Sequence, residues 1–211
     1  QILFHRKPKK KRGAKNTRRR SKDRESVVWG NLVDQVGAAP PGVKWVHVND
    51  RGSDDFEVFS RIQAVGNSCV IRAARLNRHI ETVDGRGMSL KKLLGTLPLQ
   101  DVRELKVPAK ADEPERMATL ELRFSELRMP VPKVLTPWLK EHRPAGSLTL
   151  WVVELLEKNP PQGIKGLHWV LYTMEQVTTI AQADLAIEWY NRRPTVEDYH
   201  KAFKTGCHVQ E

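Results

Sequence analysis

Cysteine is scarce in this chain of 211 residues, which contains only Cys69 and Cys207. The two cysteines lack the paired spacing of a zinc site, and a single disulfide would not be a scaffold, so we expect both thiols to be reduced. Long apolar runs are also missing: no stretch of 18 apolar residues occurs, and no short apolar segment follows a basic start. We therefore expect neither a membrane span nor a secretory signal, and a cytoplasmic location.

Acidic residues are nearly absent from the first 24 positions, which hold twelve Lys or Arg and the single acid Asp23. Of the 36 basic and 25 acidic residues in the chain, 24 of each remain beyond that point, so the formal net charge of +11 lies entirely in residues 1–24. Because this segment has no apolar periodicity, we interpret 6–24 as a basic loop. Three roles stay open for it: a solvated loop, contact with a phosphate backbone, or a nuclear-import signal.

What the chain does contain is enough apolar sequence, 39%, to bury a core as one or two domains. It begins with Gln and opens on "ILF", so we expect it to be a fragment of a longer protein. Strand and helix patterns alternate over residues 1–75, which is the order of an α/β layer with parallel pairing. The segments are a strand "QILFH", a helix Glu25 to Val36 closed by Gly37, a strand "VKWVHVND" ending at Asp50, a helix in "DDFEVFSRIQAVG" capped by Asp54 and stopped by Gly66, and a strand "SCVIRAAR".

The pattern changes near residue 76. After one short helix in "SLKKLLGTL", apolar and polar residues alternate between proline-rich joints, which predicts antiparallel strands at 119–124, 147–157 and 166–173. A helix is then expected in "TIAQADLAIEWYNRR". We therefore predict an α/β core with a mixed sheet in residues 1–75, a β-rich antiparallel insertion in 76–165, and completion of the core in 166–211.

The stretch "WYNRRPTVEDYHKAFKTG" places one carboxylate among cations. Arg193 precedes a proline, so the chain should bend there and begin a new helix at Pro194. On that helix Glu197 shares a face with Lys201 and Lys204, at offsets of four and seven residues. The ordinary explanation for this grouping of charges is an exposed helix stabilised by surface ion pairs.

A second carboxylate, that of Asp50, suggests a metal-binding role for Glu197. Asp50 follows a predicted central strand at the strand's carboxyl end, where open α/β sheets place their sites. Asp50 and Glu197 together could hold a divalent metal ion, because such ions require hard oxygen ligands, and the cations beside Glu197 would then hold phosphate. A turn-forming role for Asp50 is the alternative.

Four blocks in this order resemble one family. The run from Tyr190 to Lys204 fits the spacing Y-x2-R-x3-E-x6-K, the signature of bacterial insertion-sequence transposases of family four, which includes the transposase of transposon five. "NDRGSDDFEVF" resembles the family's second catalytic-aspartate block, followed by "CVIRAAR", and "HWVLYT" lies at a fitting distance before the tyrosine. The resemblance covers most of the chain from Glu25 onward.

The resemblance implies a ribonuclease-H-like core with a β-rich insertion and an Asp-Asp-Glu triad that binds two Mg²⁺ or Mn²⁺ ions. Asp50 matches the second acid and Glu197 the third, so these are the expected catalytic residues and metal ligands. The expected DNA contacts are Tyr190, Arg193, Lys204, Lys201, Arg72 and Trp169. Trp169 matches the aromatic residue that receives a flipped base, although a tryptophan on a strand is more often part of a core.

The activity implied is cut-and-paste transposition. Metal-activated water cuts the transposon end, and the new 3′ hydroxyl forms a hairpin and later attacks target DNA. The family's first aspartate lies upstream of "QILF" and its dimerisation helices lie beyond the last residue, so we expect this fragment to be inactive alone and the homodimer of the synaptic complex to form through other regions. Action on DNA would associate the protein with the bacterial nucleoid.

Two alternatives belong to other functional classes. One is a catalytically inactive, transposase-derived DNA-binding fragment. The other is a basic RNA-binding or structural protein whose acids lie merely at the surface.

Overall fold

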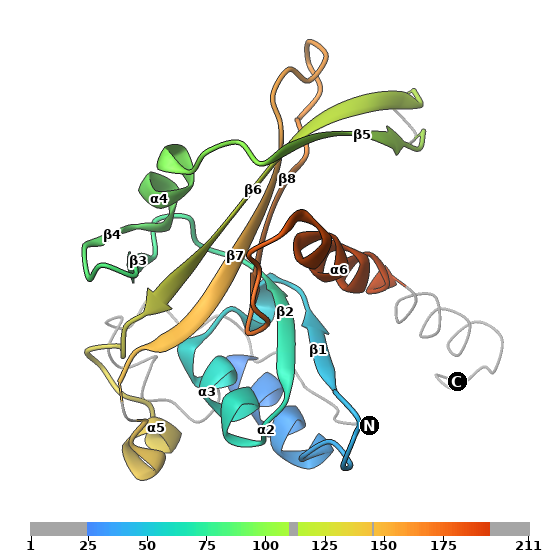
Figure 1. The fold of residues 1–211 in the computed structure, drawn as a ribbon. Helices are drawn as coiled ribbons and strands as arrows, with labels where there is room; N and C mark the ends of the chain where they lie inside the picture. Colours follow the sequence, from blue (N-terminus) through green and yellow to red (C-terminus); the bar gives the residue numbers. More distant parts are fainter. Residues whose placement is uncertain (1–24, 110–113, 145, 195–211) are drawn as a thin grey trace, which may run out of the picture.

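The computed structural model describes residues 25–109, 114–144 and 146–194, which form an α/β structure around one mixed sheet (Figure 1). The strands are β1 (Val46–Asn49), β2 (Ser68–Arg72), β3 (His79–Glu81), β4 (Gly87–Ser89), β5 (Asp101–Val107), β6 (Arg116–Met129), β7 (Leu148–Glu157) and β8 (His168–Thr173). The helices are α2 (Glu25–Val36), the 3-10 helix η1 (Arg51–Ser53), α3 (Phe56–Ala64), α4 (Leu90–Thr96), α5 (Pro137–His142) and α6 (Ile180–Asn191).

The sheet has the strand order β1-β2-β8-β7-β6-β3-β4, with β5 paired to β6. The β1–β2 pair is parallel, as expected, and all the other pairs are antiparallel. The expected α/β class with a mixed sheet is confirmed. Strands β6 and β7, which come from the range predicted to be an insertion, continue the same sheet through the pairing of β7 with β8.

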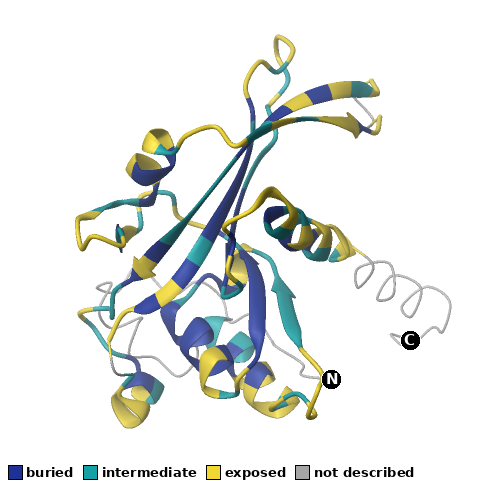
Figure 2. Ribbon diagram, in the orientation of Figure 1, coloured by how far each residue is buried: buried dark blue, intermediate teal, exposed yellow. Residues whose placement is uncertain are grey.

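Helices cover both faces of the sheet around β2, which explains why β2 is buried along most of its length (Figure 2). Cys69 and Ile71 of β2 face a cluster that includes the side chains of α3, α4 and the partly buried Trp29 of α2. Val70 faces the other way, into a cluster with Ala183, Ala186 and Tyr190 of α6. Side chains alternate along a strand, so every second residue of β2 points toward α6.

Several element boundaries differ from the sequence-based expectations. The first strand ends at Asn49 rather than Asp50, because Asp50 is the N-cap of η1. Asp55, not Asp54, caps α3, since its side chain accepts the backbone N–H of Glu57. The strand expected at 119–124 extends over all fourteen residues of β6.

Some elements had no counterpart among the predictions. They are η1, β3, β4, β5 and α5. The segments 1–5 and 195–211, for which a strand and a helix were expected, lie outside the described residues.

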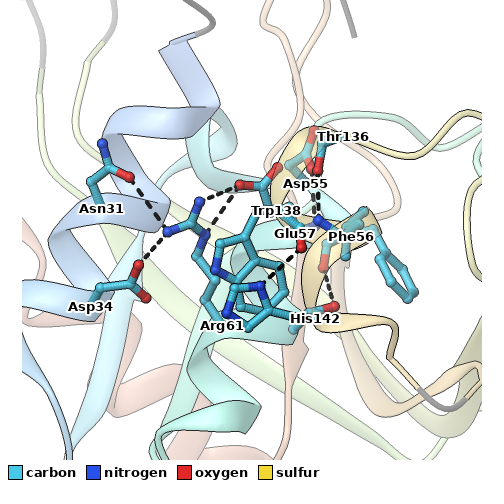
Figure 3. Close-up of polar contacts among 11 residues, drawn as sticks. Asn31, Asp34, Asp55, Phe56, Glu57, Arg61, Thr136, Trp138 and His142 are labelled. Atoms are coloured by element: carbon cyan, nitrogen blue, oxygen red, sulfur yellow. Dashed lines mark hydrogen bonds and ion pairs between the residues drawn. The ribbon is translucent and has the colours of Figure 1, made fainter. Parts of the chain in front are cut away.

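A buried arginine connects three helices (Figure 3). Arg61 of α3 is 5% exposed and donates hydrogen bonds to Glu57 one turn earlier, at 2.6 and 3.1 Å. It also donates to Asp34 and Asn31 of α2, and its guanidinium carbon lies 4.9 Å from the ring centroid of Trp138 in α5. A buried cation needs such partners, because an unpaired charge away from water is strongly unfavourable. The network fixes α2 against α3.

The same arginine dictates the residue at position 30 of α2. A Cβ atom on Gly30 would lie 2.7 Å from Arg61 Nε, too close for any side chain to fit without displacing the guanidinium. The neighbouring Trp29 is partly buried against the core cluster on this face of the sheet.

No helix in the described part of the chain is long and apolar enough to cross a membrane.

Candidate functional site at the ends of β1 and β2

The parallel pairing of β1 and β2 brings two candidate residues to one edge of the sheet. Asn49 pairs with Ile71, so the next residues, Asp50 and Arg72, stand at the same edge. Strand β8 runs antiparallel to β2, with Arg72 opposite Leu171, so the beginning of β8 lies at this edge as well. Polar side chains from distant parts of the sequence therefore meet where β1 and β2 end and β8 begins.

Asp50 has a defined orientation at this edge. Its Oδ1 accepts a hydrogen bond of 2.8 Å from the backbone N–H of Gly52, which caps the short η1 helix. Its backbone carbonyl accepts the Ser53 hydroxyl at 3.0 Å. The side chain remains 46% exposed. The alternative role, that of a turn former, is thus seen locally, and the carboxylate is still accessible to a ligand.

Helix α6 delivers a cation to the same carboxylate. The helix ends at Asn191, and Arg193 in the following turn points its Nη2 toward Asp50 Oδ2 at 3.5 Å. The two residues are 143 positions apart in sequence. Both side chains are partly exposed, 30% and 46%, so this long contact contributes little to stability. The contact matters because it places Arg193, near the beginning of the run from Tyr190 to Lys204, beside the end of β1.

Trp169 and Tyr190 form an aromatic pair on the α6 face. Their ring centroids are 5.6 Å apart with an interplanar angle of 67°, an edge-to-face arrangement. Tyr190 is 7% exposed and belongs to the core cluster under α6, whereas Trp169 is only partly buried against it. The ring of Trp169 thus helps to seat α6 on the sheet while part of its surface stays accessible.

Arg72 lies two residues beyond Val70 on β2, so it points to the same face as α6. Its Nη2 donates a 3.0 Å hydrogen bond to the backbone carbonyl of His168, the residue before Trp169. Its Nε is buried and has no hydrogen-bond partner in the described structure. The guanidinium is therefore anchored at one end beside the aromatic pair.

Sequence analysis did not identify the role of Asp54. Its side chain is inaccessible to solvent and pairs with Arg78 at 2.5 Å. It also accepts the backbone N–H of Ala74, just after β2, at 2.7 Å. Asp54 therefore ties the loop after β2 to the loop after β1 and keeps Asp50 and Arg72 at one edge. Burial raises the pKa of the nearby Tyr172 hydroxyl, and the Asp54 carboxylate raises it further.

Sequence analysis also did not anticipate the polar contact made by His168, the residue before Trp169. His168 is bonded through Nε2 to the buried Glu154 of β7 at 2.8 Å. The carboxylate also lies 3.8 Å from Arg123 on β6. No sequence pattern distinguishes this cross-strand pair from ordinary alternation, since it requires the strand register to be known.

The remaining candidates, Glu197, Lys201 and Lys204, lie outside the described residues, so the meeting of Asp50 with Glu197 remains a prediction. Within the described residues no group of three or more His, Cys, Asp or Glu side chains could hold a metal ion. Asp50 is suited to be one ligand of a metal ion, because it offers an accessible carboxylate oxygen, the donor that Mg²⁺ and Mn²⁺ prefer.

No protein-family model matches the chain. The arrangement itself combines one accessible carboxylate, two arginines and a partly exposed tryptophan. Carboxylates bind metal ions, guanidinium groups bind phosphate oxygens, and aromatic rings stack on bases. These groups suit a phosphodiester and the base next to it.

Proposed function

We propose that this chain is the catalytic region of a DNA transposase that cleaves transposon ends and joins them to target DNA. The observation that supports it most is the contact of Arg193 with Asp50, because it joins the two sequence blocks on which the resemblance depends. The proposed fold is a ribonuclease-H-like core, for which the parallel β1–β2 pair and its flanking helices would supply one half. The proposed place of action is the bacterial cytoplasm.

The chain's own residues would hold the substrate. Arg193 and Arg72 would donate hydrogen bonds to phosphate oxygens near the cleaved bond, neutralising charge that water would otherwise have to solvate. The accessible part of Trp169 would stack on a base displaced from the duplex. Tyr190 would keep Trp169 in position through the edge-to-face contact.

Asp50 and Glu197 would be ligands of the two Mg²⁺ or Mn²⁺ ions. Such ions activate the attacking hydroxyl group and stabilise charge on the oxygen that leaves. Asp50 would contribute Oδ2, since Oδ1 already accepts the Gly52 N–H.

The test uses the complete protein with DNA that carries the sequences flanking its gene, and measures end binding, nicking and hairpin formation on gels. Asp50→Asn keeps the size of the side chain but removes the negative ligand, so cleavage should be lost while end binding is kept. Asp84→Asn is the matched control, because Asp84 is an exposed residue between β3 and β4 with Arg86 as its partner. Unreduced cleavage by the Asp50→Asn protein would exclude Asp50 as a catalytic ligand, and no binding of any DNA end by the parent protein would exclude the proposed function.

A further inference from the structure

The two carboxylate oxygens of Asp50 have different surroundings. Oδ1 accepts the Gly52 N–H at 2.8 Å and is turned into the η1 loop. Oδ2 points toward Arg193 at 3.5 Å, at the edge where β1 and β2 end. The orientation of the side chain therefore decides which oxygen faces a ligand at this edge.

Gly52 leaves little room for a side chain beside this carboxylate. A Cβ atom at position 52 would lie 3.0 Å from Asp50 Oδ1 and 3.2 Å from Trp29 Nε1. The backbone of Gly52 does not have the positive φ found at Gly37, Gly42 or Gly66, so the conformation alone does not require glycine here. The requirement is for space between the carboxylate and the indole ring.

The indole ring cannot simply move away. Trp29 packs against the core cluster beneath α2. The helix that carries it is fixed to α3 by the bonds from Arg61 to Asp34 and Asn31 (Figure 3). A side chain added at position 52 would therefore displace the Asp50 carboxylate rather than the Trp29 indole ring.

We infer that Gly52 and Trp29 are positioning residues for Asp50: the Gly52 N–H holds Oδ1 inward, and the Trp29 ring backs the loop so that Oδ2 faces the divalent ion and the DNA. The inference rests on the proposed function for the identity of that ligand. It assigns no direct contact with substrate to either residue.

The main test is Gly52→Ala, with Gly95→Ala as the matched control. Gly95 lies in α4, a Cβ atom there would meet nothing within 4 Å, and its φ is not positive, so alanine is tolerated. In crystal structures of the 211-residue chain, Gly52→Ala should turn the Asp50 carboxylate and lengthen or break the Gly52 N–H bond. Gly95→Ala should leave both unchanged.

A second measurement follows the ion. In the complete protein bound to its DNA end, electron paramagnetic resonance should show Mn²⁺ binding weakened about ten-fold or more by Gly52→Ala, the size typical of changing a residue that orients a metal ligand. The affinity for the DNA end and the melting temperature should stay close to those of the parent protein. If the role of Gly52 were only structural, the melting temperature would fall as well.

An Asp50 carboxylate in its parent orientation in the Gly52→Ala crystal structure would overturn the inference, whatever the protein's activity. If the parent protein neither binds nor cleaves DNA ends, the proposed function fails, and the crystal structures alone still decide the positioning role. If Gly52→Ala does not fold, Trp29→Leu becomes the test: it should loosen the η1 loop and turn the carboxylate, and an unmoved carboxylate in that variant would reject the inference.

Discussion

Replacing Arg193 by alanine should affect DNA binding far more than folding. In the folded chain Arg193 contacts Asp50 at 3.5 Å, and the two side chains are 30% and 46% exposed. Ion pairs of this kind are screened by solvent and contribute at most about 1 kcal/mol. For a chain of this size that corresponds to a change in melting temperature of about 2–4 °C or less.

The effect on DNA binding has a different origin. If Arg193 holds one phosphate, its removal should reduce the slope of log affinity against log salt concentration by about 0.9, because one fewer counterion is released. The affinity itself should fall at every salt concentration. Fluorescence anisotropy with a labelled DNA end between about 50 and 200 mM salt measures both quantities.

Arg192 provides the control for the Arg193 variant. It is the adjacent residue and carries the same charge, but it pairs with Glu188 on the exposed side of α6. Arg192→Ala should leave the salt slope close to that of the parent chain. Equal slopes for the parent and Arg193→Ala proteins would refute a phosphate contact.

Three further predictions concern charge in other parts of the chain. Burial lowers the pKa of His47 from its ordinary value of 6.5, so the folded protein favours the neutral ring, which accepts a hydrogen bond from Asn67. The stability that this preference contributes is complete above pH 6.5 and is lost as the pH falls through the lower pKa of the folded state. In urea unfolding at several pH values, the free energy of unfolding of His47→Gln should therefore depend less on pH than that of the parent. Asp54→Asn should destabilise by about 3–5 kcal/mol, because it leaves the Arg78 guanidinium as a buried charge without a counter-charge, and a loss below about 1 kcal/mol in chemical denaturation would contradict the buried pair. Deleting residues 1–24, which carry the whole net charge, should weaken DNA binding and flatten its salt dependence without changing which end is preferred; an unaltered salt slope would count against that role.

The helices were predicted best where a strong stop follows a clear apolar period. Helix α2 ends at Val36 as predicted, because Gly37, with φ of 72°, stops it. Strands β3 and β4 have three residues each, too few for an alternation to be recognised. Helix α5 was missed although Thr136 caps it and Pro137 begins it, because its six residues carry no apolar period.

The candidate site was predictable only in part. Two consecutive parallel strands bring the residues after them to one edge, so the proximity of Asp50 and Arg72 follows from recognising β1 and β2. The approach of Arg193 does not follow from any local pattern. It depends on how α6 packs its small residues Ala183 and Ala186 against the sheet, which is a property of the tertiary structure.

The three acids in "NDRGSDD" show most clearly why sequence could not complete the site. Asp50, Asp54 and Asp55 are all plausible helix caps or metal ligands by residue type alone. In the structure Asp55 caps α3, Asp54 is buried against Arg78, and Asp50 remains 46% exposed. This separation of roles depends on neighbours that lie far away in sequence, since Arg78 removes Asp54 from solvent while Gly52 and Trp29 leave one Asp50 oxygen turned outward. The resemblance selected Asp50 by its position in a motif. In the structure burial excludes Asp54 as a ligand, and Asp55, which is only partly buried like Asp50, is used as the cap of α3.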